Sequence, residues 1–74
     1  MKAQHVTLPI EDLRCGGALI VERALARTPG VLRVYVNAAT EMAYIQYDAD
    51  RCTINALREA VARAGFQAGV PVAV

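Results

Sequence analysis

The sequence predicts an α+β fold with the element order βαββαβ, in which two helices cover one face of a four-stranded antiparallel sheet. Three observations lead to this fold class. The hydrophobic residues recur with a period of two in some segments and of about 3.6 in others. Glycine or proline marks most of the boundaries, and 55% of the 74 residues are apolar. A chain of this length and composition makes one domain, which we expect to span residues 1–74.

The first strand and the first helix follow from a change in hydrophobic period. Over residues 6–11 apolar side chains alternate with others, which predicts a strand, and Pro9 should lie near its end because proline donates no ladder hydrogen bond. From Ala18 to Arg27 the apolar residues fall at helical spacing. This helix should end at Thr28-Pro29-Gly30, because proline cannot continue a helix and glycine suits its exit.

The second half of the chain repeats this alternation of strand and helix. Residues 31–37 are rich in β-branched side chains and predict a strand, which a short turn connects to a third strand over Met42–Tyr47. Thr53 is a suitable N-cap for a second helix that Gly65 closes. Gln67–Val74 is predicted as one last strand, with Pro71 at a sheet edge. With right-handed crossovers, this order gives the ferredoxin-like arrangement with strand order 4-1-3-2.

The composition argues against several classes of protein. The formal net charge is +1 and the chain has one Phe and no Trp, so it lacks the basic stripe or stacking aromatics of a nucleic-acid-binding protein. Uncharged stretches are too short to cross a bilayer, and we expect no membrane insertion. Met1–His5 is not followed by the apolar segment of a secretory signal. Two cysteines do not make a disulfide framework, so we expect a cytoplasmic protein with free thiols.

The connection between the first strand and the first helix contains the most reactive side chain. Gly16 and Gly17 precede a helix whose N-terminus carries about half a positive charge. A thiol at Cys15 should ionise more easily there, and Arg14 acts in the same direction. The thiolate is the form that binds soft metals such as Cu(I). Two alternatives stay open on the residues alone: a cysteine without a role in a tight loop, and an anion site on the Gly-Gly turn.

Landmark segments at compatible spacings cover nearly the whole chain. They are Leu8-Pro9-Ile10-Glu11, Val21-Glu22-Arg23-Ala24-Leu25, Pro29-Gly30-Val31, Val34-Tyr35-Val36-Asn37, Ala43-Tyr44-Ile45-Gln46-Tyr47-Asp48, Leu57 with Ala60-Val61, and Ala64-Gly65-Phe66. In these segments the chain resembles the heavy-metal-associated (HMA) domain. The family includes small copper chaperones, mercury- or zinc-handling proteins and the N-terminal domains of metal-pumping P-type ATPases. The resemblance implies soft-metal binding by two cysteines in a Gly-Met-Thr-Cys-x-x-Cys loop.

The chain departs from the family pattern at that loop. Aligned from the first strand, Asp12-Leu13-Arg14-Cys15 replaces Gly-Met-Thr-Cys, and Ala18 stands at the second cysteine. Aligned backward from Val21-Glu22, the loop is one residue shorter, and Arg14 and Gly17 stand at the two cysteine positions. At most one ligand of the pair is kept in either alignment. Cys15 is therefore the principal candidate ligand, with Asp12 as a minor oxygen ligand for Zn(II) or Cd(II).

Three further residues are interpreted by their place in the predicted topology. Phe66 matches the aromatic or basic residue that lies beside the metal loop in the family. Cys52 follows the third strand, at the opposite end of the domain from Cys15, and we expect it to be a small core residue. His5 begins the first strand at that same end, near Asp48 and Cys52, and we expect a surface histidine. With its only histidine far from Cys15, the chain has no Cys–His pair, and we do not expect an enzyme.

Two sets of apolar residues are candidates for contact with other molecules. Leu19 and Ile20 break the amphipathic pattern next to Cys15 and make a candidate docking patch. Tyr35, Met42 and Tyr44 should lie on the sheet face away from the helices. The alternative for both sets is ordinary exposed apolar surface.

The sequence therefore predicts a soft-metal binding or transfer module in which Cys15 binds the metal, most simply Cu(I). Because Cu(I) prefers two sulfur ligands, the second ligand would be Cys15 of another chain in a metal-bridged homodimer, a small thiol, or a cysteine of a receiving P-type ATPase or other metal-handling protein. The alternative is a metal-independent interaction module that keeps the HMA scaffold and has lost its site.

Overall fold

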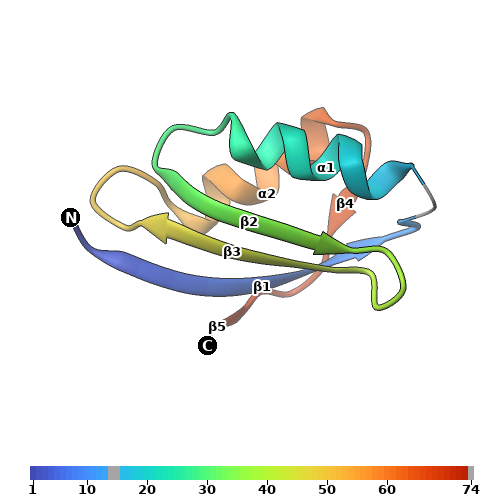
Figure 1. Ribbon diagram of the computed structural model, residues 1–74, viewed down its shortest axis with the longest axis horizontal. Helices are drawn as coiled ribbons and strands as arrows, with labels where there is room; N and C mark the ends of the chain where they lie inside the picture. The colour runs from blue at the N-terminus through green and yellow to red at the C-terminus, as the bar shows by residue number, and fades with distance from the viewer. Residues whose placement is uncertain (14–15, 74) are drawn as a thin grey trace.

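The computed structural model describes residues 1–13 and 16–73, with two helices on one face of a sheet (Figure 1). The elements are β1 (Ala3–Glu11), α1 (Gly17–Ala26), β2 (Val31–Asn37), β3 (Met42–Asp48), α2 (Ile54–Arg63), β4 (Gln67–Ala68) and β5 (Val72–Ala73). The strands pair in the order β2-β3-β1-β4, and all pairs are antiparallel. The predicted ferredoxin-like fold and its strand order 4-1-3-2 are confirmed.

The topology brings three connections to one end of the molecule. The end of β1, the beginning of α1 and the turn between β2 and β3 lie together on the right of Figure 1. The connection from β3 to α2, which contains Cys52, lies at the other end. The candidate metal loop and the second cysteine are therefore separated by the length of the sheet, as the sequence predicts.

The last strand differs from the prediction of one strand over Gln67–Val74. Two short strands, β4 and β5, both pair with β1: Ile10 opposite Ala68, and Thr7 opposite Val72. These pairs are three residues apart on β1 and four apart on the C-terminal segment, so one extra residue lies between β4 and β5. Pro71 has no N–H to donate, and the ladder is interrupted between β4 and β5, where the Gly69 N–H donates to the Pro9 carbonyl oxygen at 2.7 Å.

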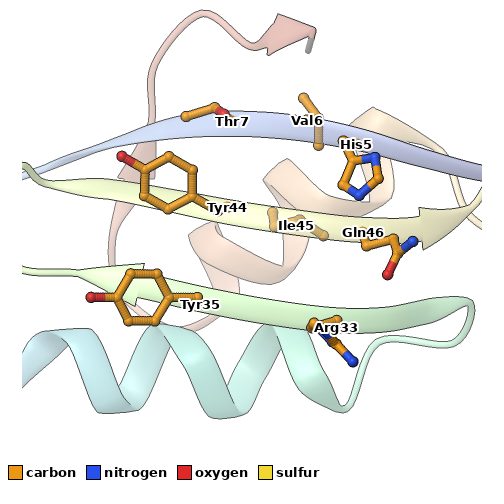
Figure 2. A pocket seen from close by; sticks show the side chains of 8 residues that line it. All are labelled: His5, Val6, Thr7, Arg33, Tyr35, Tyr44, Ile45 and Gln46. Carbon is orange, nitrogen blue, oxygen red and sulfur yellow. The ribbon is translucent and has the colours of Figure 1, made fainter.

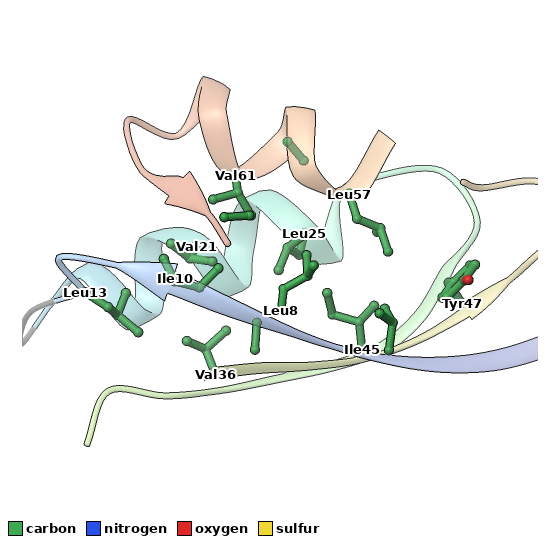
Figure 3. Packing of buried hydrophobic residues seen from close by; sticks show 14 of the residues in the cluster. Leu8, Ile10, Leu13, Val21, Leu25, Val36, Ile45, Tyr47, Leu57 and Val61 are labelled. Carbon is green, nitrogen blue, oxygen red and sulfur yellow. The ribbon is translucent and has the colours of Figure 1, made fainter. Parts of the chain in front are cut away.

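The core lies between the sheet and the helices, and alternation along the strands selects its members (Figure 3). The largest fully buried side chains come from β1, β3 and both helices: Leu8, Ile10, Leu25, Ile45, Leu57, Val6, Val21 and Val61. Each strand thus contributes one face to the core, as the period of two predicts. The other face of the sheet is left uncovered by helices (Figure 1).

The helix ends agree with the sequence signals to within one residue. α1 begins at Gly17 instead of Ala18, after Gly16, which offers no side-chain cap. The hydroxyl of Thr53 accepts the Ala56 N–H at 3.1 Å, which confirms Thr53 as the N-cap of α2. Both helices have 10 residues. Over the part of the chain that the structure describes, neither is long and apolar enough to span a membrane.

Candidate functional site

The candidate metal loop connects β1 to α1. Arg14 and Cys15, on which the metal-site prediction depends most, lie outside the described residues. On either side of them, Asp12 and Gly16 are exposed and have positive φ values, 57° and 89°. Left-handed backbone is unusual for aspartate, so the chain makes a sharp turn before the candidate ligand as well as after it.

Leu13 fixes the loop to the core. Its side chain is only 5% exposed and belongs to the main hydrophobic cluster, as expected of the residue at the family's loop methionine. Its N–H donates a hydrogen bond to the Glu41 Oε2 atom at 3.1 Å. Glu41 stands in the turn between β2 and β3, and its own carbonyl oxygen accepts the Ile10 N–H at 2.8 Å. The described chain before Cys15 is therefore held by side-chain burial and by two hydrogen bonds.

Glu41 was not predicted from the sequence as a residue of this site. Hydrophobic periodicity does not indicate a functional role for a glutamate in a turn, and Glu41 is 28 positions from Leu13 in the sequence. Only the pairing of the strands brings the two together.

Phe66 packs against the first turn of α1. A Cβ atom added to Gly17 would lie 3.0 Å from Phe66 Cζ and 3.5 Å from Leu13 Cδ1. Gly17 is itself buried, so only a residue without a side chain lets the ring approach the helix this closely. The aromatic ring thus lies at the base of the candidate loop, while its role toward a metal stays a prediction.

The described residues alone do not make a metal site. Within residues 1–13 and 16–73, no three side chains of His, Cys, Asp or Glu gather where they could hold one metal ion. Asp12 is exposed and its assignment as a minor ligand stays a prediction. The assignment of Cys15 as the principal ligand likewise stays a prediction.

Leu19 and Ile20 lie on the exposed side of α1, with 51% and 53% of their surfaces accessible. Their exposure agrees with the prediction. Ile20 also lines a shallow groove between α1 and α2, together with Arg27 and Arg63. This surface therefore combines apolar side chains with positive charge.

The open face of the sheet carries a pair of tyrosines. Tyr35 of β2 and Tyr44 of β3 stack with ring centroids 6.0 Å apart, and their side chains are 57% and 43% exposed. Figure 2 shows the two rings on neighbouring strands. Met42 is half-buried at the start of β3. His5 is exposed on this face and pairs with Gln46, whereas Cys52 lies in the core. The exposure of His5 confirms the surface histidine that the sequence predicts.

Cys52 is a core residue, as predicted. It is 5% exposed, and its thiol donates to the Thr53 carbonyl oxygen at 3.6 Å. Burial raises the pKa of this thiol, because the thiolate would lose its hydration. The protonated thiol is a poor metal ligand at neutral pH.

Asp48 ties the N-terminus to the end of β3 and gives the fold a predicted acid sensitivity. Its Oδ1 atom accepts the N–H groups of Lys2 and Asp50, each at 3.0 Å, and these hydrogen bonds lower the pKa of the carboxyl group.

A lowered folded-state pKa of Asp48 stabilises the protein above the ordinary carboxyl pKa, and that stabilisation is lost as the pH falls through the folded-state pKa. The free energy of unfolding in urea should therefore drop below about pH 4, and it should drop less in Asp48→Asn. Equal pH slopes for the two proteins would contradict this role of Asp48.

Comparisons with known proteins agree with this architecture. The heavy-metal-associated domain pattern matches residues 7–67. The chain is 42% identical over 69 residues to the probable copper-transporting ATPase PacS of Synechocystis sp., covering 92% of this chain and 9% of the ATPase. It is 34% identical over 62 residues to the periplasmic component of a mercuric transport protein of Shewanella putrefaciens, covering 82% of this chain and 68% of that protein. The chain therefore spans less than a tenth of the first relative and about two thirds of the second.

Solved structures superpose closely on the described fold. Oxidized MerP from Ralstonia metallidurans has a TM-score of 0.88 at 29% identity, covering 92% of this chain and 96% of that one. The N-terminal domain of PacS from Synechocystis has a TM-score of 0.79 at 40% identity, covering 90% and 96%. The sequence match over residues 7–67 and the shared strand order lead to one conclusion: the chain belongs to the heavy-metal-associated domain family.

Proposed function

We propose that this chain is a cytoplasmic module, formed by residues 1–74 as one domain, that binds or transfers a soft metal through Cys15. One observation carries the proposal: the scaffold that holds a metal loop is intact on both sides of residue 15. Leu13 is buried before it, and Gly17 packs on Phe66 after it. Cu(I) is the favoured cargo, since a relative with 42% identity is named a probable copper-transporting ATPase. The name of the mercuric relative leaves Hg(II) as a second soft metal of the same chemistry.

The second metal ligand comes from another molecule in this proposal. The chain has two cysteines, and Cys52 is buried at the far end of the sheet with its thiol pKa raised. Because Cu(I) prefers sulfur ligands, Cys15 would share the metal with Cys15 of a second copy, with a small thiol such as glutathione, or with a cysteine of a receiving pump. Zn(II) or Cd(II) would use Cys15 with the oxygen of Asp12. A site completed by exchangeable ligands suits metal transfer better than metal storage. The proposed role is therefore to bind and pass on a metal, and no catalytic step is proposed.

The surface next to the loop suits a metal-handling partner such as a P-type ATPase. Leu19 and Ile20 are exposed beside the groove that contains Arg27 and Arg63. An apolar patch bordered by arginines favours a partner with an apolar centre and acidic residues around it. The cytoplasmic location rests on the number of cysteines, because two cysteines do not make the disulfide framework of a small secreted domain.

The second candidate function is a metal-independent interaction module, and the single loop cysteine is the observation that favours it. In that case the apolar patch would mediate contact by itself. Removing Cys15 would change nothing, whereas Leu19→Asp or Ile20→Asp would abolish the contact.

The mass of the reduced protein, measured with and without Cu(I), separates the two functions. We expect Cu(I) to convert the 8.0 kDa chain into a species of twice that mass at high protein concentration, and added glutathione to return it to a monomer that keeps its metal. Cys15→Ser should stay monomeric, and Cys52→Ser, which removes the buried thiol, should behave as the parent chain. A dimer that forms equally without metal and in Cys15→Ser would favour the second function.

A further inference from the structure

Glu41 makes two hydrogen bonds to the segment that leads into the candidate metal loop. Its carbonyl oxygen accepts the Ile10 N–H at 2.8 Å, and its carboxylate accepts the Leu13 N–H at 3.1 Å. The two donors are three residues apart on the chain, and one residue holds both. No other side chain is recorded as a hydrogen-bond partner of Leu13 among the residues that the structure describes.

The backbone around these bonds is unusual on both sides. Glu41 has a φ of 55° and Asp12 a φ of 57°, and these are the only two non-glycine residues with positive φ in the part of the chain that the structure describes. Left-handed backbone is unfavourable for residues with a side chain, so neither conformation persists unless its surroundings fix it. The hydrogen bonds of Glu41 join the two residues' segments and provide that restraint.

Glu41 therefore has more than the role of an ordinary turn residue. A turn needs only its backbone, but here the side chain reaches out of the β2–β3 connection to a different segment, next to the candidate site. Leu13 precedes Cys15 by two residues, and its backbone direction decides where the chain enters the loop. An anchored Leu13 has less conformational freedom to lose when a metal binds to the loop that follows it.

We infer that Glu41 is a positioning residue for the proposed metal loop: its carboxylate fixes the Leu13 amide, two residues before the proposed ligand Cys15. The metal part of this inference rests on the proposed function. The positioning part does not, because it can be measured on the metal-free protein.

The test compares three variants with the parent chain at a temperature where all are folded. Glu41→Ala removes the acceptor, and Glu41→Gln removes the charge but keeps a carbonyl oxygen that accepts the same N–H. Glu59→Ala removes one negative charge from the exposed face of α2 and is the matched control. Three quantities are measured: hydrogen exchange of the Leu13 amide, the alkylation rate of Cys15 in the metal-free protein, and the affinity for Cu(I) against a competing chelator.

For Glu41→Ala we expect faster exchange at Leu13, with the core amides of Leu8 and Ile45 unchanged, and a changed alkylation rate at Cys15. Its affinity for Cu(I) should fall about 10-fold, the lower end of the loss when a residue that orients a metal ligand is removed. Glu41→Gln should restore all three quantities toward the parent values, and Glu59→Ala should match the parent. A role in folding alone would lower the unfolding free energy without changing the affinity of the folded protein.

The inference is overturned if Leu13 exchange is unchanged in Glu41→Ala, or if exchange rises while the affinity and the alkylation rate stay at the parent values. If the parent chain and Cys15→Ser bind Cu(I) equally, the proposed function fails and the alkylation rate decides. A changed rate in Glu41→Ala that Glu41→Gln restores then supports the positioning of Cys15, and an unchanged rate contradicts it.

Discussion

Replacing Cys15 with serine should lower the affinity for Cu(I) by more than about 100-fold, which exceeds the loss from removing a residue that only orients a ligand. The reason is chemical: serine offers a neutral hydroxyl oxygen, and Cu(I) selects soft sulfur ligands. Within residues 1–13 and 16–73, no three side chains of His, Cys, Asp or Glu gather where they could hold one metal ion. The measurement is an anaerobic titration of the reduced protein with Cu(I) against a chelator of known affinity.

Cys52→Ser is the matched control for this experiment. It removes one thiol as well, but from a buried side chain at the other end of the sheet. Its affinity for Cu(I) should equal that of the parent chain. If Cys15→Ser and Cys52→Ser lower the affinity for Cu(I) equally, both thiols bind the metal. The loop that contains Cys15 would then have no special role in metal binding.

Replacing Gly30 with alanine should produce the largest loss of stability among single changes at glycine. Gly30 has a φ of 90°, and an added Cβ would lie 2.7 Å from Cys52 Cβ and 3.1 Å from the carbonyl carbon of Arg51. Strained backbone and overpacking together cost about 2–5 kcal/mol. A chain of 74 residues has a total stability of about 4–11 kcal/mol. Urea unfolding of Gly30→Ala should therefore show a large part of the stability lost.

Gly65→Ala separates the cost of backbone strain from the cost of overpacking. Gly65 has a similar φ of 95°, but an added Cβ there would meet no atom within 4 Å. This variant should lose only the backbone part, about 1–2 kcal/mol. If Gly30→Ala and Gly65→Ala lose the same stability, the close contact between Gly30 and Cys52 does not matter.

Most of the fold could be predicted because local signals and burial agree. The alternation at Val6, Leu8 and Ile10 gives a strand because these three side chains share the face of the sheet that packs against the core. The Thr53 cap is a local interaction, so three neighbouring residues are enough to indicate it. The interruption between β4 and β5 was missed, because it depends on how the C-terminal segment pairs with β1, which no local pattern indicates.

The candidate site was only partly predictable for the same physical reason. Cys15 is recognised by its type and its place before a helix, and Phe66 by the family pattern. Glu41 acts through a hydrogen bond between residues that are 28 positions apart, which no local pattern encodes. The second metal ligand belongs to another molecule in our proposal, and one chain's sequence does not contain it.

The X-ray absorption spectrum of the Cu(I) complex tests the proposed site most directly, because it reports the atoms bound to the metal. The account predicts a shell of sulfur atoms alone for the parent chain and for Cys52→Ser, and the loss of that shell in Cys15→Ser. A shell of nitrogen or oxygen atoms in the parent chain, or a sulfur shell that persists unchanged in Cys15→Ser, would contradict it.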